Sequence, residues 1–242
     1  MANFYLREDL DGVAVDDEVE LVGAEAKHMA TVSRTRVGES ILIGNGRGMV
    51  AGATVLRVEP SRVTLRADVV DVSARPSPRV TLVQALAKGG RDELAVQVAT
   101  ELGVDAIVPW SAARSISRWD AAKATKGRDR WSAIAREATK QSIRPWLPEV
   151  EPLVSTGTLI QRAGETRMLV LEPTADAPLS AVSADERDLI IVVGPEGGLS
   201  ATELEDLQAG GAQLVRLGTT VLRTSSAGPA ALAVVNTILR RW

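Results

Sequence analysis

The sequence predicts an α/β protein with two parts, a small β-rich N-terminal domain and a larger C-terminal domain built on a mostly parallel sheet. Residues 1–73 carry short alternating segments rich in β-branched residues, which are typical of strands. After the proline-containing linker 74–79, strand-like and helix-like segments alternate over residues 80–242, which favours a parallel sheet. The 242 residues are enough for both domains, and with 3% aromatics their core must consist mainly of aliphatic side chains.

The N-terminal segments predict a small β-barrel of five or six strands. Asn45-Gly46 favours a tight hairpin turn between two of them, and only Glu25–Thr31 has a helical pattern. The predicted strand segments cover residues 19–23, 40–48, 49–58 and 62–72, with a turn at Gly44-Asn45-Gly46.

The C-terminal segments alternate between buried strands and amphipathic helices. The predicted strands are 79–86, 104–110, 167–173, 188–193 and 212–218, and the predicted helices are 90–103, 128–142, 155–163, 201–211 and 226–239. Apolar periodicity indicates buried faces made by Leu94, Ala95, Val98 and Leu102 in one helix and by Trp131, Ile134 and Ala138 in the next.

Hydroxyl and carboxylate side chains mark the starts of three of these helices. Ser200 and Glu203 have the spacing of a capping box. Ser155 or Thr156 is expected to cap the helix 155–163, and one of Thr224, Ser225 and Ser226 the last helix.

Three strands of the C-terminal domain end in conspicuous loops. The loops are Leu171-Glu172-Pro173, residues 194–198 (GPEGG) and residues 217–224 (LGTTVLRT). In a parallel sheet the carboxyl ends of the strands share one edge, where ligands bind. That edge is therefore the candidate site.

The glycine loop does not fit a polyphosphate. A phosphate-binding loop needs a lysine followed by Ser or Thr, whereas here Leu199-Ser200 follow and no lysine occurs after Lys140. Glu196 would also repel a pyrophosphate. The loop suits a neutral or cationic nucleoside, with a plain strand-to-helix turn as the alternative.

Composition excludes several kinds of site. The absence of cysteine rules out disulfides, thiolate metal sites and a cysteine nucleophile, and the single histidine, His28, argues against a His-rich metal site. The chain has no stretch long and apolar enough for a transmembrane helix, and its charged N-terminus lacks a signal core, so a cytoplasmic protein is expected.

Basic residues gather in one segment although the net charge is −3. Between Arg114 and Arg144 there are nine cations and three acids, which suits phosphate contacts or a solvated helix face. Arg223 is a second conspicuous cation, because it lies between Val221-Leu222 and an apolar helix at the candidate edge. A structural ion pair is the alternative to a functional role for Arg223.

Several motifs together resemble one family. The stretches VGPEGGLSATE and LGTTVLRTSSAGPAALAVV, preceded by KGGRDELAVQVATELGVDAIVPW and REATKQSIRPWLPEV, are similar to the ribosomal RNA small subunit methyltransferase E family of the SPOUT superfamily. HMATVSRTRVGESILIGNGRG also resembles the His-then-Arg pattern of that family's N-terminal domain. The resemblance covers nearly the whole chain.

The resemblance implies a PUA-like β-barrel that binds RNA, followed by an α/β domain with a deep trefoil knot. It also implies a homodimer that uses S-adenosylmethionine to methylate N3 of a uridine in 16S rRNA of the small ribosomal subunit, without a metal and away from membranes. One departure is visible: the family often has Pro-Arg where this chain has Thr219-Thr220, and an acidic residue in place of Ser225.

Site residues follow from the loops and the resemblance together. Arg223 and Glu196 are the catalytic candidates, Arg223 as the cation that would stabilise a uracil anion. The cofactor-binding candidates are Leu171, Glu172, Gly194, Glu196, Gly197, Gly198, Leu217, Gly218, Leu222 and Thr224. The RNA-binding candidates are His28, Arg34, Arg36, Arg114, Arg118 and Arg144, with Arg47 and a stacking Trp119 as further possibilities.

Three other functions stay open at this point. The chain fits another SPOUT methyltransferase acting on tRNA or on a ribose 2′-hydroxyl. The Thr219-Thr220 departure also allows an RNA-binding protein whose catalytic site has decayed. A nucleotide-binding α/β enzyme is disfavoured because the phosphate lysine is missing.

Overall fold

The computed structural model describes residues 3–242, which form two compact units. Unit 1 comprises residues 1–75 and 139–147, of which 1 and 2 lie outside the described residues, and unit 2 comprises residues 76–138 and 148–242. The sequence placed 139–147 in the C-terminal domain. In the structure this segment packs in unit 1, where the Gly48 N–H donates to the Pro145 carbonyl (2.9 Å) and Lys140 Nζ lies 3.2 Å from Glu25 Oε1.

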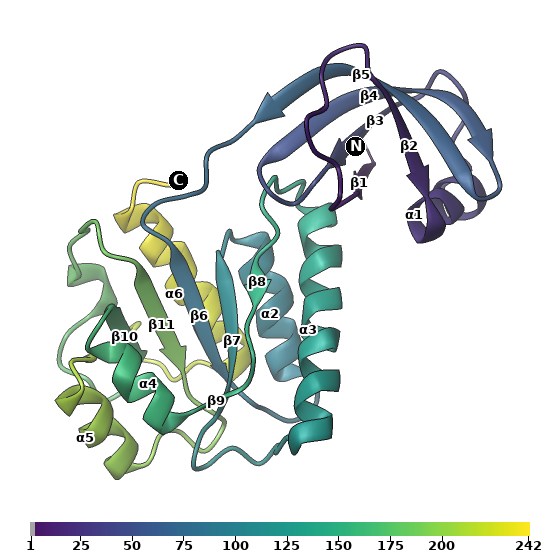
Figure 1. The fold of residues 1–242 in the computed structure, drawn as a ribbon. Coiled ribbons are helices and arrows are strands. Elements are labelled where there is room, and N and C mark those ends of the chain that lie inside the picture. Colours follow the sequence, from purple (N-terminus) through teal and green to yellow (C-terminus); the bar gives the residue numbers. More distant parts are fainter. Residues whose placement is uncertain (1–2) are drawn as a thin grey trace. The chain divides into compact units, whose positions relative to one another are not determined.

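Unit 1 is a curled five-stranded sheet (Figure 1). Its strands are β1 (Phe4–Leu6), β2 (Glu18–Val22), β3 (Ser40–Gly44), β4 (Met49–Glu59) and β5 (Arg62–Val72), in the order β1-β3-β4-β5-β2. The predicted strands and the predicted helix are confirmed, the helix as α1 (Gly23–Lys27) followed by a π-helical turn, η1 (His28–Val32). The sequence missed β1, whose three residues are too few for an alternating pattern.

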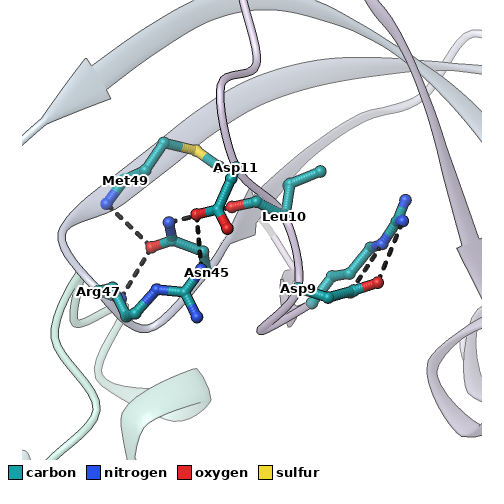
Figure 2. Close-up of polar contacts among 7 residues, drawn as sticks. Asp9, Leu10, Asp11, Asn45, Arg47 and Met49 are labelled. Carbon is teal, nitrogen blue, oxygen red and sulfur yellow. Dashed lines mark hydrogen bonds and ion pairs between the residues drawn. The ribbon is translucent and has the colours of Figure 1, made fainter.

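The turn between β3 and β4 is organised by the buried side chain of Asn45 (Figure 2). Its Oδ1 accepts the N–H groups of Arg47 (2.8 Å) and Met49 (3.1 Å), and its Nδ2 donates to the Leu10 carbonyl (3.1 Å). The predicted hairpin is therefore confirmed, with a loop longer than two residues. Arg47 pairs with Asp11 at 2.5 Å and stays half-exposed, so its RNA contact remains a prediction.

Unit 2 has a sheet in which every pair of strands is parallel. The order is β12 (Gln213–Val215), β10 (Arg167–Leu171), β11 (Leu189–Val193), β6 (Val80–Ala85), β7 (Ala106–Ser111) and β8 (Glu149–Val150), with β9 (Val154–Ser155) also paired to β7. The predicted α/β class is confirmed. The two-residue strands β8 and β9 were not predicted, and the trefoil knot stays a prediction.

Helices cover both faces of this sheet (Figure 1). Alternate residues of β6 point to opposite faces. Leu82 shares a core with residues of α2 (Arg91–Glu101), α3 (Ala121–Gln141) and α6 (Thr224–Ile238), whereas Val83 shares the other core with residues of α4 (Thr156–Ala163) and α5 (Ala201–Ala209). A single-turn 3-10 helix, η2 (Leu179–Ala181), follows β10.

Three helical details differ from the predictions. Leu94 is 49% exposed, so the buried face of α2 is formed by its smaller residues Ala95, Val96 and Ala99. Helix α3 starts before residue 128 because Asp120 Oδ1 accepts the N–H of Lys123 (2.9 Å). No hydroxyl caps α6, whose N-cap residue is Arg223. The predicted caps Ser155 on α4 and Ser200 with Glu203 on α5 are confirmed.

Candidate functional site

A pocket of about 410 Å³ opens at the carboxyl ends of the unit 2 strands. The loops after β10 and β11 and the segment between β12 and α6 line it, so the shared edge predicted from the sequence is confirmed. Arg91, the first residue of α2 after the loop that follows β6, adds to the lining. This fourth strand end was not predicted as part of the site, although β6 is parallel to its neighbours and must end at the same edge.

Nine of the ten predicted cofactor residues line the pocket, and so does Arg223. The exception is Gly197. A Cβ at this position would meet Arg114 Cβ at 3.3 Å, so Gly197 allows the loop to pack on Arg114. The lining residues that were not predicted are Arg91, Pro173, Val193, Pro195, Leu199, Arg216, Thr220, Val221 and Ala227.

The pocket contains three arginines and no lysine. Arg91 donates to Glu196, and Arg216 donates to the carbonyls of Ala175 and Asp176. Arg223 is exposed, and within residues 3–242 its side chain has no hydrogen bond or ion pair. The structural ion pair considered for Arg223 is therefore absent from the described chain, and its guanidinium is available to a ligand.

Glu196 is held in place by two groups from the loop after β6 and the start of α2. Its Oε1 accepts the Lys88 N–H (2.9 Å) and Arg91 Nη1 (2.7 Å). Burial alone would raise the pKa of this carboxyl, but these hydrogen bonds and the Arg91 charge outweigh it, and the pKa lies below its usual range. The ionised Glu196 side chain thus joins the glycine loop to the loop after β6.

The turn after β10 is fixed by its own side chains. Glu172 Oε1 accepts the N–H (3.1 Å) and the hydroxyl (2.8 Å) of Thr174. The Glu172 N–H donates to the Val215 carbonyl (2.9 Å), which joins this turn to the end of β12. Glu172 therefore shapes the pocket wall that contains Leu171.

A buried carboxylate, Glu203, anchors the start of α5 below the glycine loop. Oε2 accepts the N–H and the hydroxyl of Ser200, both at 3.0 Å. Oε1 accepts the Ala113 N–H (2.7 Å) and the Thr156 hydroxyl (3.2 Å). Burial would raise the pKa of Glu203, but the four hydrogen bonds together lower it. The glycine loop thus ends on a helix tied to two other elements.

The predicted RNA-binding arginines of unit 2 hold backbone carbonyls. Arg114 Nη1 donates to the carbonyls of Gly197 (3.2 Å) and Leu199 (3.0 Å), and Arg118 Nη2 donates to that of Ala113 (2.8 Å). Both remain exposed. Trp119 packs edge-on against the buried Trp131, with ring centroids 5.5 Å apart, so its partly buried ring packs against the core.

The remaining RNA candidates belong to unit 1. His28, Arg34 and Arg36 are exposed on one continuous segment that begins with the π-helical turn. The rings of His28 and Tyr5 form a T-shaped pair with centroids 6.2 Å apart. Arg34 has a positive φ of 51°. Arg144 is half-buried in the segment 139–147.

The pocket has apolar walls that suit the base of a nucleoside. Its described walls combine aliphatic side chains, such as Leu171, Leu217 and Leu222, with backbone around Gly194 and Gly198. Its carboxylates are Glu172 and Glu196, and Glu196 is paired with Arg91. In residues 3–242 no cluster of His, Cys, Asp or Glu has the arrangement of a metal site, and no helix is long and apolar enough to cross a membrane.

Family models match both parts of the chain. A model described as an RNA methyltransferase domain matches residues 75–236, and one described as an RNA methyltransferase PUA domain matches residues 21–68. Among curated proteins, the chain is 42% identical to a Mycobacterium tuberculosis protein named ribosomal RNA small subunit methyltransferase E, over 97% of this chain and 90% of the relative. It is 33% identical to the Bacillus subtilis protein of the same name, over 89% and 88%.

Solved structures with the same fold include two complexes with S-adenosylmethionine. The Neisseria gonorrhoeae ribosomal RNA small subunit methyltransferase E has a TM-score of 0.88 and 28% identity, over 98% of both chains. A Legionella pneumophila structure described as a putative methyltransferase has a TM-score of 0.84 and 27% identity, again over 98% of both chains.

Proposed function

Because the chain belongs to the ribosomal RNA small subunit methyltransferase E family, we propose that it methylates N3 of a uridine in 16S rRNA, with S-adenosylmethionine as the donor. One observation carries the proposal: an unpartnered arginine, Arg223, borders an apolar pocket without lysine at the strand ends. When bound, the cofactor supplies a methyl group activated by a positively charged sulfur.

The residues of the pocket have distinct proposed roles. Leu171, Leu217 and Leu222 would enclose the adenine, and the backbone at Gly194 and Gly198 would approach the rest of the cofactor. Uridine N3 carries a proton at neutral pH, so the reaction is favoured where negative charge on the uracil oxygens is stabilised. The Arg223 guanidinium is the group for that task.

Glu196 is proposed as a positioning residue, which revises the catalytic role suggested by the sequence. A carboxylate with a lowered pKa that already accepts two hydrogen bonds is a poor acceptor for the N3 proton. The other carboxylate of the pocket, Glu172, accepts two hydrogen bonds from Thr174, so in this proposal a group of the RNA or solvent acts as the general base.

Replacing Glu196 with glutamine tests this assignment. We expect the Kd for S-adenosylmethionine to rise by about three- to tenfold, because an ion pair at a half-exposed site contributes only about 1 kcal/mol. The rate at saturating cofactor should change little. Calorimetry and single-turnover kinetics measure the two quantities, with the exposed Glu165→Gln as a control. A fall in that rate of roughly 100-fold or more would restore Glu196 as the base.

RNA contacts are proposed for both units. His28, Arg34 and Arg36 are the candidates in unit 1, and Arg114, Arg118 and Arg144 those in the basic segment. Arg114 and Arg118 keep their charge while they hold carbonyls, so they can still attract phosphates. The proposed RNA-binding part is residues 1–73 and the proposed methyltransferase part is residues 80–242, of which 139–147 pack in unit 1.

A homodimer in the cytoplasm is part of the same proposal. Val221 and Leu222 at the pocket are 78% and 38% exposed, which supports a partner surface next to the cofactor site. Light scattering of the purified protein decides the point, and a monomer at micromolar concentration would contradict it.

Two measurements test the central proposal. Calorimetry should show S-adenosylmethionine binding in the micromolar range, and its absence would contradict every methyltransferase function. Mass spectrometry of RNA after incubation with protein and cofactor should then place one methyl group on uridine N3 of 16S rRNA. A methyl group found only in tRNA, or on a ribose oxygen, would favour another SPOUT activity, and binding without transfer would favour a decayed site.

A further inference from the structure

An amide side chain is buried in the middle of the unit 2 sheet. Gln84 lies near the carboxyl end of β6, between Val193 of β11 and Pro109 of β7, and is fully buried. Its surroundings on this face are aliphatic, since Leu82 and Val193 belong to the core beneath α6. Burying an amide there costs free energy unless its polar atoms form hydrogen bonds.

The amide begins a relay of two hydrogen bonds. Gln84 Nε2 donates to Thr224 Oγ1 (2.8 Å) and to the Ala85 carbonyl (3.1 Å). Thr224 Oγ1 donates in turn to the Gly194 carbonyl (2.9 Å). The direction is fixed, because both carbonyl oxygens can only accept: the single hydroxyl proton goes to Gly194, and the amide must present its NH₂ group to Thr224.

The relay joins the glycine loop to the start of α6 through Gln84, which lies outside the pocket lining. Gly194 is the first residue after β11, and Thr224 is the first residue of α6, directly after Arg223. Both line the pocket, whereas Gln84 does not. Thr224 is 6% exposed, and its hydroxyl does not cap α6 because the relay uses it.

We propose that Gln84 is a positioning residue for the cofactor site. Acting through Thr224, it sets the separation between the glycine loop and the loop that carries Leu217, Leu222 and Arg223. A pocket whose walls are held at one separation binds its ligand without a further ordering cost. This inference rests on the proposed function, because the ligand concerned is S-adenosylmethionine.

A methionine at position 84 removes the relay and keeps the volume of the side chain. Gln84 Oε1 has no hydrogen-bond partner within the described chain, so this change also removes a desolvation cost and the protein should still fold. Asn236 of α6 offers a matched control. It is 1% exposed, donates from Nδ2 to the Leu102 carbonyl (2.7 Å) and likewise has an unpartnered Oδ1, but it does not line the pocket.

The first test is calorimetry with S-adenosylmethionine. Gln84→Met should raise the Kd about tenfold, as expected for the loss of one or two buried hydrogen bonds from an ordered site, whereas Asn236→Leu should leave it unchanged. Methyl transfer at saturating cofactor should be affected much less than affinity. Equal weakening by the two variants, or no weakening by Gln84→Met, would overturn the inference.

The second test concerns Thr224 and shows whether Gln84 acts through it. Thr224→Val, which keeps the shape and removes the hydroxyl, should weaken binding as Gln84→Met does, and Thr224→Ser should recover the lost affinity. The double variant Gln84→Met/Thr224→Val should be no weaker than either single variant, because both changes break one relay. Additive losses would contradict the relay.

Hydrogen exchange without cofactor separates this inference from the proposed function. Gln84→Met should accelerate amide exchange in residues 194–200 and 217–226, and Asn236→Leu should not. Unchanged exchange in both segments would overturn the positioning role even if the protein binds another ligand. Failure of the wild-type protein to bind S-adenosylmethionine would instead contradict the proposed function.

Discussion

Replacing Arg223 with alanine is expected to lower the rate of methyl transfer at saturating cofactor by roughly 100- to 1,000-fold, the usual effect of removing one group that stabilises developing negative charge. Arg223 borders the pocket, is exposed and has no partner within residues 3–242. Its loss therefore breaks no hydrogen bond or ion pair of the described chain. The Kd for S-adenosylmethionine should change by less than about threefold, because the sulfonium is itself a cation and gains nothing from a second one.

Single-turnover kinetics with 16S rRNA and calorimetry with the cofactor measure the two effects separately. Arg187→Ala is the control, since Arg187 is an exposed arginine of the same unit that pairs with Asp185 away from the pocket. It should leave both quantities unchanged. A loss of cofactor affinity as large as the loss of rate would assign Arg223 to binding instead.

Replacing Glu203 with glutamine is expected to reduce the free energy of unfolding by about 2–3 kcal/mol. This is the range found when a buried hydrogen-bond donor loses its acceptor. The carboxylate is 5% exposed, and its two oxygens accept four hydrogen bonds. The NH₂ group of glutamine would face hydrogen-bond donors whichever way the amide turned. Chemical denaturation measures the loss, and Glu205→Gln on the exposed side of α5 is the matched control.

The same carboxylate gives stability a defined pH dependence. Because the folded state lowers the pKa of Glu203, its contribution is complete above the unfolded value of 4.5 and is lost as the pH falls through the lower folded value. The difference in unfolding free energy between wild type and Glu203→Gln should therefore shrink below pH 4.5. A difference that stays constant into that range would show that Glu203 acts through packing alone.

Local signals in the sequence predicted most of this arrangement. Ser200 and Glu203 stand three residues apart, so their capping box was predictable. The other partners of Glu203 were not, because Ala113 and Thr156 are 90 and 47 residues away in the chain. Side-chain contacts between elements depend on the packing of the whole sheet, which no local pattern encodes.

The predictions that the structure corrected also failed because they depend on contacts between distant elements. Thr224 has the residue type of a cap, but it is the first residue inside α6, and its hydroxyl joins Gln84 to the Gly194 carbonyl. Arg114 is predictable as a basic residue, and only the fold shows that it holds the glycine loop. Leu94 fits a helical period, yet α2 packs through smaller residues that allow a closer approach.

The pairing of β6 with β11 also affects how the protein folds during its synthesis. Val80 lies opposite Leu189, so the centre of the sheet joins residues separated by more than a hundred positions. Such long-range parallel pairing is slow to form, because the entropy cost of closing a large loop comes before the strands gain any stabilising contact. The last wall of the pocket begins only at residue 216. A chain emerging from the ribosome therefore has no complete pocket until almost all of it has been made.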